Sequence, residues 1–341
     1  MTIMNSTLYK LCVAPMMGHT DKHFRYLLRI ISKKSMLYTE MVASNSILHN
    51  KRNKLNKLEH NNENPVGFQL GGDDPQQLAD CAEIVESYGY NEINLNIGCP
   101  SKRAQSGNFG ACLFGQPELV AKCVKQISKV TKLPITVKTR LGIDDFDDIK
   151  HLENFINIVS EGGIETFHLH ARKAILKKGV NPRKNRSVPP IEYEKVYNIK
   201  EKYPTLKIIL NGEINAPLDV VNHLKYVDGV MIGRAVCNNP FILNDIEKLI
   251  YKENVINKEK VLSEYFHYII NNFNNNIVFY KHEPEISEPT PIELPEDALP
   301  SLDIGDLQNL ANSKTTTDSN SDGYPDSYDI MPGLETPNFK G

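Results

Sequence analysis

The sequence predicts an α/β protein built as a (β/α)8 barrel, and three observations support this prediction. Eight short apolar segments recur over the first ~240 residues, each of them ends in polar or glycine residues, and most are followed by a helical pattern. Strands that alternate with helices form parallel sheets, and eight such units close a barrel. A doubly wound open sheet is the alternative architecture for the same pattern.

The expected elements follow one another with short connections. Strands are expected at residues 11–17, 36–42, 66–71, 92–99, 135–140, 166–170, 207–211 and 229–233. Helices are expected at residues 21–31, 75–88, 117–130, 147–160, 193–202 and 217–224, and several begin with Asp or Pro, which suits a helix N-terminus. Residues 100–116 are expected to form a polar, glycine-rich loop, and residues 44–64 and 172–190 two long loops, the latter strongly basic.

Composition changes sharply near residue 280. Residues 282–341 contain 13 acidic and 2 basic side chains, whereas residues 1–281 contain 29 acidic and 37 basic ones. We therefore expect three parts: a barrel over residues 1–250, a truncated helical segment over 251–280, and an acidic, proline-rich tail over 281–341 that is disordered. Within the second part, residues 258–272 place apolar side chains at helical spacing. A basic body of this kind attracts polyanions.

The cysteines and apolar runs narrow the class of protein. The six cysteines form no C-x-x-C pair, so neither a zinc site nor a redox dithiol is predicted. No run approaches the ~18 apolar residues of a membrane helix, and a secretory signal pattern is missing. We expect a cytoplasmic protein without a metal in its body. The tail carries one calcium-loop pattern, which arises easily in acidic low-complexity sequence, at Asp318, Asn320, Asp322, Gly323, Asp326 and Asp329.

Polar residues concentrate at the carboxyl ends of the expected strands, where barrels of this type assemble their active sites. Taken singly, each residue has an ordinary explanation as a loop hydrogen-bonder, a salt-bridge partner or a core histidine. Their shared location favours a ligand site. The residues are Pro15, Met16, Met17, Glu40, Gln69, Asn96, Cys99, Lys138, Arg140, His168, His170, Asn211, Gly212, Glu213, Gly233 and Arg234.

These groups suit a planar cofactor that carries a phosphate. Glycines after the last two strands allow close approach to backbone N–H donors, and Arg234 adds a cation. Flavin mononucleotide fits this description, with Lys138 near the ring end that becomes negative on reduction and Gln69 at the pyrimidine edge. Cys99, where a strand stops at a Gly-Cys-Pro sequence, is either a buried apolar residue or an acid that protonates an activated C=C bond opposite the hydride.

A set of strings carries a family resemblance. In chain order they are APMMGHTDKHFR, LYTEMV, NPVGFQLGG, INLNIGCPSKRAQSGNFGACL, ITVKTRLGIDD, HLHARKAIL, PRKNRSVPPIEY, LNGEI and DGVMIGRAVCNNP. The match runs from about Leu11 to Leu243. The combination of NIGCPS, VKTR, HARKA and NGE in this order is highly specific. The chain thereby resembles the tRNA-dihydrouridine synthases, and most of all their A-type bacterial subfamily.

The resemblance implies an FMN enzyme, recharged by NADPH, that reduces the C5=C6 bond of uridine in the D-loop of tRNA, at positions 20 and 20a in this subfamily. It implies that Cys99 donates the proton to C5 while hydride reaches C6. Asn96, Arg172 and Lys173 match positions at the substrate uridine, and Arg183 and Arg186 lie in the basic loop expected to hold the tRNA while the uridine is turned out of its stack. The implied flavin contacts are Pro15, Met16, Met17, Gln69, Lys138, His170, Asn211, Gly212, Glu213, Gly233 and Arg234. Glu213 stands where a glycine is common in the family.

The resemblance weakens after the barrel. The family continues with a helical domain that binds tRNA, and only residues 258–272 resemble its beginning. Two other interpretations therefore stay open. One is an FMN barrel that acts on a free pyrimidine or enoate, against which the long basic loop argues. The other is a catalytically impaired flavoprotein or an RNA-binding remnant. No obligate protein partner is evident from the sequence.

Overall fold

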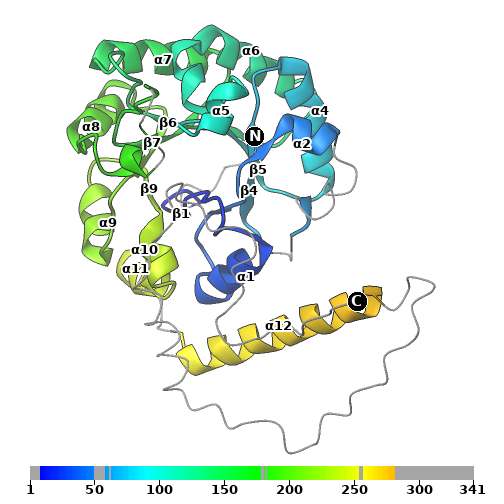
Figure 1. The fold of residues 1–341 in the computed structure, drawn as a ribbon. Helices are drawn as coiled ribbons and strands as arrows, with labels where there is room; N and C mark the ends of the chain where they lie inside the picture. Colours follow the sequence, from blue (N-terminus) through cyan, green and yellow to red (C-terminus); the bar gives the residue numbers. More distant parts are fainter. Residues whose placement is uncertain are drawn as a thin grey trace, which may run out of the picture. The chain divides into compact units, whose positions relative to one another are not determined.

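A closed parallel barrel is formed by the strands in the first 240 residues (Figure 1). The computed structural model describes residues 8–49, 58–60, 63–177, 180, 183–252 and 256–280. Around the barrel the strand order is β1, β9, β8, β7, β6, β5, β4 and β2, and β3 pairs with β4. The (β/α)8 prediction is confirmed and the open sheet is excluded. The strands are β1 (Leu11–Val13), β2 (Leu37–Tyr38), β3 (Val42–Ala43), β4 (Val66–Gly71), β5 (Glu92–Ile97), β6 (Ile135–Arg140), β7 (Thr166–His170), β8 (Lys207–Asn211) and β9 (Gly229–Ile232).

Two tight seams close the sheet at β1. On one side, Cys12 pairs with Met36 next to β2, where the N–H of Met36 donates to the carbonyl of Leu11 at 2.9 Å. On the other side, β9 runs so close to the start of β1 that a Cβ on Gly229 would lie 1.9 Å from the carbonyl oxygen of Tyr9. Glycine is therefore required at this position for β9 to pair with β1.

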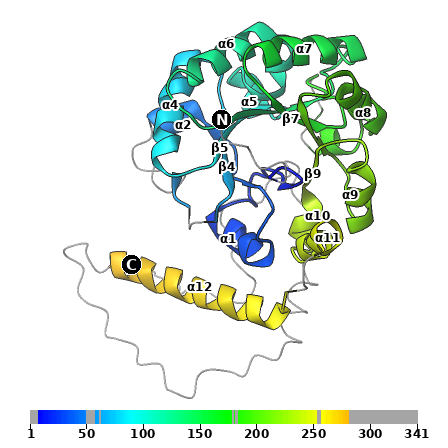
Figure 2. The ribbon, with the colours of Figure 1, turned by 180° about the vertical axis from the view of Figure 1, so that it is seen from behind.

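Helices surround the strands in both views (Figures 1 and 2). Several begin as the sequence predicts: Asp21 and Asp74 accept hydrogen bonds from the first turns of α1 and α4, and Pro117 opens α6. The helices are α1 (Lys22–Ile31), α2 (Ser44–Leu48), α4 (Pro75–Ser87), α5 (Lys102–Ser106), α6 (Pro117–Ile127), α7 (Ile149–Glu161), α8 (Tyr193–Lys202), α9 (Pro217–His223), α10 (Arg234–Asn238), α11 (Ile242–Tyr251) and α12 (Lys258–Tyr280), with 3-10 turns η1 (Gly110–Gly115) and η2 (Lys184–Arg186).

The structure corrects the sequence predictions at two strands, at two expected loops and after the last strand, and the loop expected over residues 44–64 begins with α2. The strand expected over residues 36–42 is divided into β2 and β3, and the one expected over 11–17 ends at Val13. The loop expected before Pro117 is wrong, because it contains α5 and η1. Ser101 starts α5 by accepting a hydrogen bond from the N–H of Ala104. Helices α10 and α11 were not predicted.

The barrel interior is divided into an apolar side and a polar side. A small buried cluster, contributed by residues on or near β1, β2, β8 and β9, fills the apolar side; it comprises Tyr9, Cys12, Ala14, Met36, Tyr38, Ile209 and Met231. Strands β4 to β7 place polar side chains at the same depth, among them Gln69, Asn94 and Thr136, which are at most 1% exposed. A separate, larger cluster packs the outer faces of the strands against the helices.

The chain separates into two compact units, residues 1–275 and 276–341. In the first unit, Tyr268 of α12 stacks on Tyr26 of α1 with a centroid separation of 3.8 Å, and its hydroxyl lies 2.9 Å from Nδ1 of His23. Of the second unit the structure describes only the last turn of α12. The expected tail over 281–341 and its calcium-loop pattern lie outside the described residues. No described helix has the length and apolar content needed to span a bilayer.

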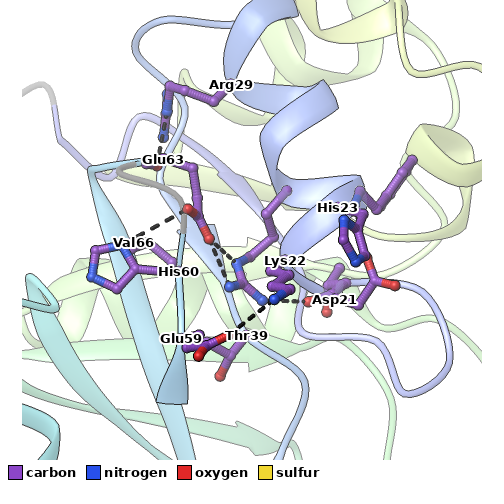
Figure 3. Close-up of polar contacts among 12 residues, drawn as sticks. Asp21, Lys22, His23, Arg29, Thr39, Glu59, His60, Glu63 and Val66 are labelled. Carbon is purple, nitrogen blue, oxygen red and sulfur yellow. Dashed lines mark hydrogen bonds and ion pairs between the residues drawn. The ribbon is translucent and has the colours of Figure 1, made fainter. Parts of the chain in front are cut away.

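A buried ion pair ties α1 to the segment before β4 (Figure 3). Nη2 of Arg25 lies 2.6 Å from Oε1 of Glu63, and both side chains are buried. Arg29, one turn later, donates to the backbone carbonyls of Glu63 at 3.0 Å and Pro65 at 2.9 Å. Breaking one member of a buried pair leaves an uncompensated charge in a medium that solvates it poorly.

Glu63→Gln is therefore expected to lower the free energy of unfolding by about 3 kcal/mol, because Arg25 keeps its buried charge without a carboxylate. Urea denaturation measures this change. The matched control is Glu59→Gln, which removes the carboxylate of a partly exposed pair with Lys22 and is expected to change stability by less than about 1 kcal/mol. Equal effects of the two substitutions would contradict the prediction.

Candidate functional site

Barrel closure brings most of the predicted polar residues to one end, which we call the mouth and define by Cys99, Lys138, His170, Asn211 and Arg234. His168 is an exception, because it is fully buried and its Nε2 lies 3.1 Å from the hydroxyl of Tyr38. The register aligns His170 of β7 with Asn211 of β8. Nζ of Lys138 donates to Oδ1 of Asn211 at 3.1 Å, and Nδ2 of Asn211 donates to the carbonyl of Met231 at 2.8 Å. These two hydrogen bonds connect β6, β8 and β9 at the mouth.

Cys99 sits in a turn that is restrained on both sides. Oδ1 of Asn96 accepts hydrogen bonds from the N–H groups of Gly98 (3.1 Å) and Cys99 (2.9 Å), and the carbonyl of Cys99 accepts one from Ala111 (2.9 Å). A Cβ at Gly110, which has φ +72°, would lie 2.5 Å from that carbonyl. The half-buried thiol is therefore held in a defined place after β5, with Sγ 3.3 Å from the hydroxyl of Ser101.

The loop after β1 lies beside the end of β9. Sδ of Met16 is 3.7 Å from Sγ of Cys237 on α10, while Met17 is exposed and Pro15 half-buried. Gly233 precedes α10, and a Cβ built there would meet nothing closer than Sδ of Met16 at 3.9 Å. Arg234, the first residue of α10, is exposed next to this space.

The mouth carries more positive than negative charge. Burial of the ammonium, with repulsion from Arg140, lowers the pKa of Lys138 to about 7, and its side-chain partner is the neutral Asn211. Burial lowers the pKa of His170 well below its ordinary value, and Arg140, Lys138, Arg172 and Arg234 add to this effect by repelling the imidazolium. Four cations thus converge on one histidine that stays neutral.

Arg140 connects the cysteine turn to the basic loop. Its guanidinium donates to the carbonyls of Gly98 (3.1 Å), Lys173 (3.0 Å) and Asn185 (3.0 Å). Asn185 is buried and exchanges two hydrogen bonds with the backbone of Ile175. Burial lowers the pKa of Arg140 to about 10, which keeps it charged at neutral pH. The position of the loop that follows β7 therefore depends on Arg140.

The residues expected at the substrate differ in how the structure uses them. Arg172 is 3% exposed, donates to the carbonyl of Pro189 and pairs with Glu213. Nζ of Lys173 pairs with Asp147 at 2.7 Å, which engages its charge within the loops. Glu213 has φ +49°, a left-handed conformation that favours glycine. Arg183 and Arg186, at and beside η2, are exposed in the basic loop.

Several residues at or below the mouth have structural roles that the sequence does not predict. The sequence places Arg140 at a strand end without a contact, and it gives Asn94 no role. The hydroxyl of Tyr193 on α8 donates to the carbonyl of Gly212 at 2.8 Å and so holds the turn after β8. The VKTR string marks Arg140, and the alternation Glu92, Asn94, Asn96 marks a polar face on a strand buried on both sides.

The mouth fits an anionic, flat cofactor. The half-buried Lys138 and the exposed Arg234 have no carboxylate partner among the described residues, and Gly233 leaves open space beside Arg234. Gly212 has φ +128°, a conformation that favours glycine, and a Cβ built there would lie 3.1 Å from the ring of His170. A surface hollow of about 500 Å³ lies elsewhere, lined by residues of α1 and α12 such as Tyr26 and Tyr268. Among the described residues no group of three His, Cys, Asp or Glu could hold a metal.

Fold and mouth together define a (β/α)8-barrel enzyme whose chemistry is built at the carboxyl ends of its strands. Residues 12–288 match the family model described as dihydrouridine synthase (Dus). The chain belongs to the dihydrouridine synthase family, and it is an oxidoreductase of that family.

Curated relatives agree with the family. The protein named tRNA-dihydrouridine(20/20a) synthase from Synechocystis sp. is 49% identical over 74% of this chain and 75% of the relative. The protein of the same name from Salmonella typhi is 49% identical over 71% of this chain and 73% of the relative. The protein of the same name from Yersinia pestis is 46% identical over 77% of this chain and 76% of the relative. A solved 2-naphthoyl-CoA reductase complex is similar in fold, with 10% identity and a TM-score of 0.52 over 72% of this chain and 50% of that chain.

Lys138→Met is expected to stabilise the ligand-free protein at low pH. The pKa of Lys138 falls from 10.5 to about 7 on folding, so below pH 7 the folded state bears the full penalty of a buried charge. As the pH rises from 7 toward 10.5 the unfolded chain binds more protons than the folded one, and the penalty disappears. The gain in unfolding free energy should therefore be largest near pH 6 and shrink toward pH 10.

Urea denaturation across this pH range measures the gain on protein stripped of ligand. Lys129→Met, at an exposed position after α6, is the control and should give no pH-dependent difference. A stability loss in Lys138→Met near pH 6 would show that the ammonium is compensated in the folded state.

Proposed function

We propose that this chain reduces the C5=C6 bond of uridine to dihydrouridine in the D-loop of tRNA, at positions 20 and 20a. The observation that carries the proposal is the restrained thiol of Cys99 beside the cationic mouth of a dihydrouridine synthase barrel. The relatives' names supply the tRNA substrate and its positions. FMN recharged by NADPH would supply the hydride that reaches C6.

The chain's own residues account for the binding of such a cofactor. Arg234 and the backbone around Gly212 and Gly233 suit its phosphate, since they combine a cation with open space and close backbone approach. Lys138 places a positive charge at the floor of the mouth, where negative charge develops on reduction. Pro15, Met16 and Met17 would flank the ring from the loop after β1, and Gln69, His170, Asn211 and Glu213 complete the proposed contacts.

Cys99 supplies the proton to C5 of the uracil. When the thiol gives up its proton, Lys138 and Arg140 stabilise the thiolate that remains, because negative charge on Cys99 raises the pKa of both cations. Asn96, half-exposed at the end of β5, is the proposed contact to the base, together with Arg172 and Lys173 from the basic loop. The reaction then needs no further acid from the solvent.

Cys99→Ala is expected to lower the rate of dihydrouridine formation at least ~100-fold, because a positioned general acid contributes this much. The assay is NADPH-driven conversion of unmodified tRNA, with dihydrouridine quantified by mass spectrometry. Cys112→Ala, a half-buried thiol in the neighbouring η1, is the matched control and should stay within about twofold of the parent, as expected for a residue outside the proposed chemistry. Undiminished turnover in Cys99→Ala would refute the assigned role.

The exposed arginines of the basic loop are expected to contact tRNA phosphates. Arg183→Ser combined with Arg186→Ser should weaken tRNA binding and reduce the slope of log affinity against log salt by about 1.5, because each lost phosphate contact removes about 0.7–0.9 of slope. Fluorescence anisotropy with labelled tRNA measures both quantities. Lys129→Ser, after α6, should leave the slope unchanged, and an unaltered slope in the arginine variant would place the tRNA elsewhere.

An impaired flavoprotein is the second candidate, and a feature of α12 favours it. Leu262, Phe266, Ile269 and Ile270 are between 39% and 53% exposed along this helix, so a large apolar stripe is uncovered in the described part of the chain. Protein that binds flavin and oxidises NADPH but leaves tRNA unmodified, even at saturating tRNA, would support this candidate over the first.

A further inference from the structure

We propose that Asn94 and Thr136 are positioning residues that fix the orientation of the Asn96 carboxamide beside Cys99, acting through Gln69. The catalytic part of this inference rests on the proposed function. Neither residue reaches the mouth, since Asn94 is 0% and Thr136 1% exposed inside the barrel. Their effect passes along a chain of hydrogen bonds between neighbouring strands.

The turn that contains Cys99 determines which group donates and which accepts in each of these hydrogen bonds. The backbone N–H groups of Gly98 and Cys99 can only donate, so Oδ1 of Asn96 must face them. Nδ2 of Asn96 then faces Gln69 and donates to its Oε1 at 2.8 Å. This assignment leaves Gln69 with its Nε2 for the next partner, and it donates to Oδ1 of Asn94 at 2.7 Å. Each amide in the chain therefore has one allowed orientation.

The series of hydrogen bonds continues to the carboxyl group of Glu92, the first residue of β5. Nδ2 of Asn94 donates to Oγ1 of Thr136 at 2.8 Å, and the Thr136 hydroxyl donates to Oε1 of Glu92 at 2.8 Å. Glu92 is fully buried, and its other oxygen accepts a hydrogen bond from Tyr9 at 2.6 Å. The end of the chain is thereby held by two strands and by the segment before β1.

The strand register brings these side chains into line. Gln69 of β4, Asn94 of β5 and Thr136 of β6 are direct partners across three adjacent strands. All of them lie inside the barrel. Rotating one carboxamide by 180° there would place an N–H group against another N–H group, and no water would be present to compensate for the lost hydrogen bond. Apolar side chains fill the opposite side of the barrel interior, and they would also fill this side without the cost of desolvating polar groups. What the polar side adds is a defined orientation at Asn96.

This orientation determines what Asn96 can offer a ligand. Both lone pairs of its Oδ1 are engaged by the two backbone N–H groups, and one of its two amide hydrogens by Gln69. The remaining hydrogen can only donate. Asn96 is therefore set to bind a carbonyl oxygen, such as those of a uracil ring, and not an amino group.

Thr136→Val and Thr136→Ser test the chain with matched variants. Valine removes the hydroxyl at nearly constant shape, which frees Asn94 and Gln69 to turn, whereas serine keeps the hydroxyl. We expect Thr136→Val to lower kcat for tRNA about tenfold, since loss of orientation at a reacting group has effects of this order, and Thr136→Ser to stay within about twofold. Equal kcat values for the two variants would overturn the proposal.

A double-mutant cycle with Asn96→Ala separates positioning from general weakening of the barrel. If Thr136 acts through Asn96, Thr136→Val should change kcat less than about twofold once Asn96 is absent, because the residues no longer act as a unit. The same fold loss in both backgrounds would overturn the proposal. Ile209→Val, a buried methyl loss on the apolar side, controls for stability and should leave kcat unchanged at a comparable fall in Tm.

Alkylation of Cys99 by iodoacetamide gives a readout that needs neither tRNA nor flavin. Peptide mass spectrometry follows Cys99 separately from the other five cysteines. Thr136→Val and Asn94→Ala should each raise the alkylation rate at least about threefold over Thr136→Ser and the parent, because the thiol turn loses its restraint. Unchanged rates would overturn the proposal even if dihydrouridine synthesis is confirmed. If the parent protein forms no dihydrouridine in tRNA, the proposed function fails while this comparison still decides the positioning role.

Discussion

Closure of the sheet at β1 is the constraint on which the mouth depends. Residues from β4 to β9 converge on one point only because β1 is paired on both sides, and the β9 seam requires the absence of a side chain at Gly229. Closure also creates an interior that has to be filled. One side is filled with apolar residues, and the other with a hydrogen-bonded series that ends at Asn96. The interior packing and the site are therefore parts of one arrangement.

The alternation of apolar segments with helical patterns was sufficient to predict the barrel, because each parallel strand is buried on both faces and reads as a short apolar run. Strand and helix ends were harder to predict. The break between β2 and β3 falls where the polar pair Thr39-Glu40 interrupts an otherwise apolar stretch, a signal too short to separate two strands by pattern alone. Helix α5 forms in a polar, glycine-rich segment because Ser101 caps it. Helices α10 and α11 follow the last strand directly, in a segment for which the sequence predicted no element.

The ends of the strands also gave the candidate site, since closure brings them together regardless of the details of packing. Lys138, Asn211 and His170 do lie at one mouth. The ion pairs of the site could not be predicted. Arg172 pairs with Glu213 and Lys173 pairs with Asp147, and both acidic residues come from other loops. Pairings between distant segments depend on loop conformations that one sequence does not encode in any periodic form. The cofactor and tRNA contacts themselves stay predictions.

The low pKa of Lys138 has a thermodynamic consequence for ligand capture. In the ligand-free barrel this amine is largely neutral at pH 8, whereas an anion bound beside it favours the ammonium. Each anion captured at this pH would therefore bring close to one proton with it from the solvent, and the heat of binding would change with the ionisation enthalpy of the buffer. Below pH 6 the amine is already charged, and this uptake vanishes. Near pH 8, a single lysine would thus couple the binding and release of an anion at the mouth to the uptake and release of a proton.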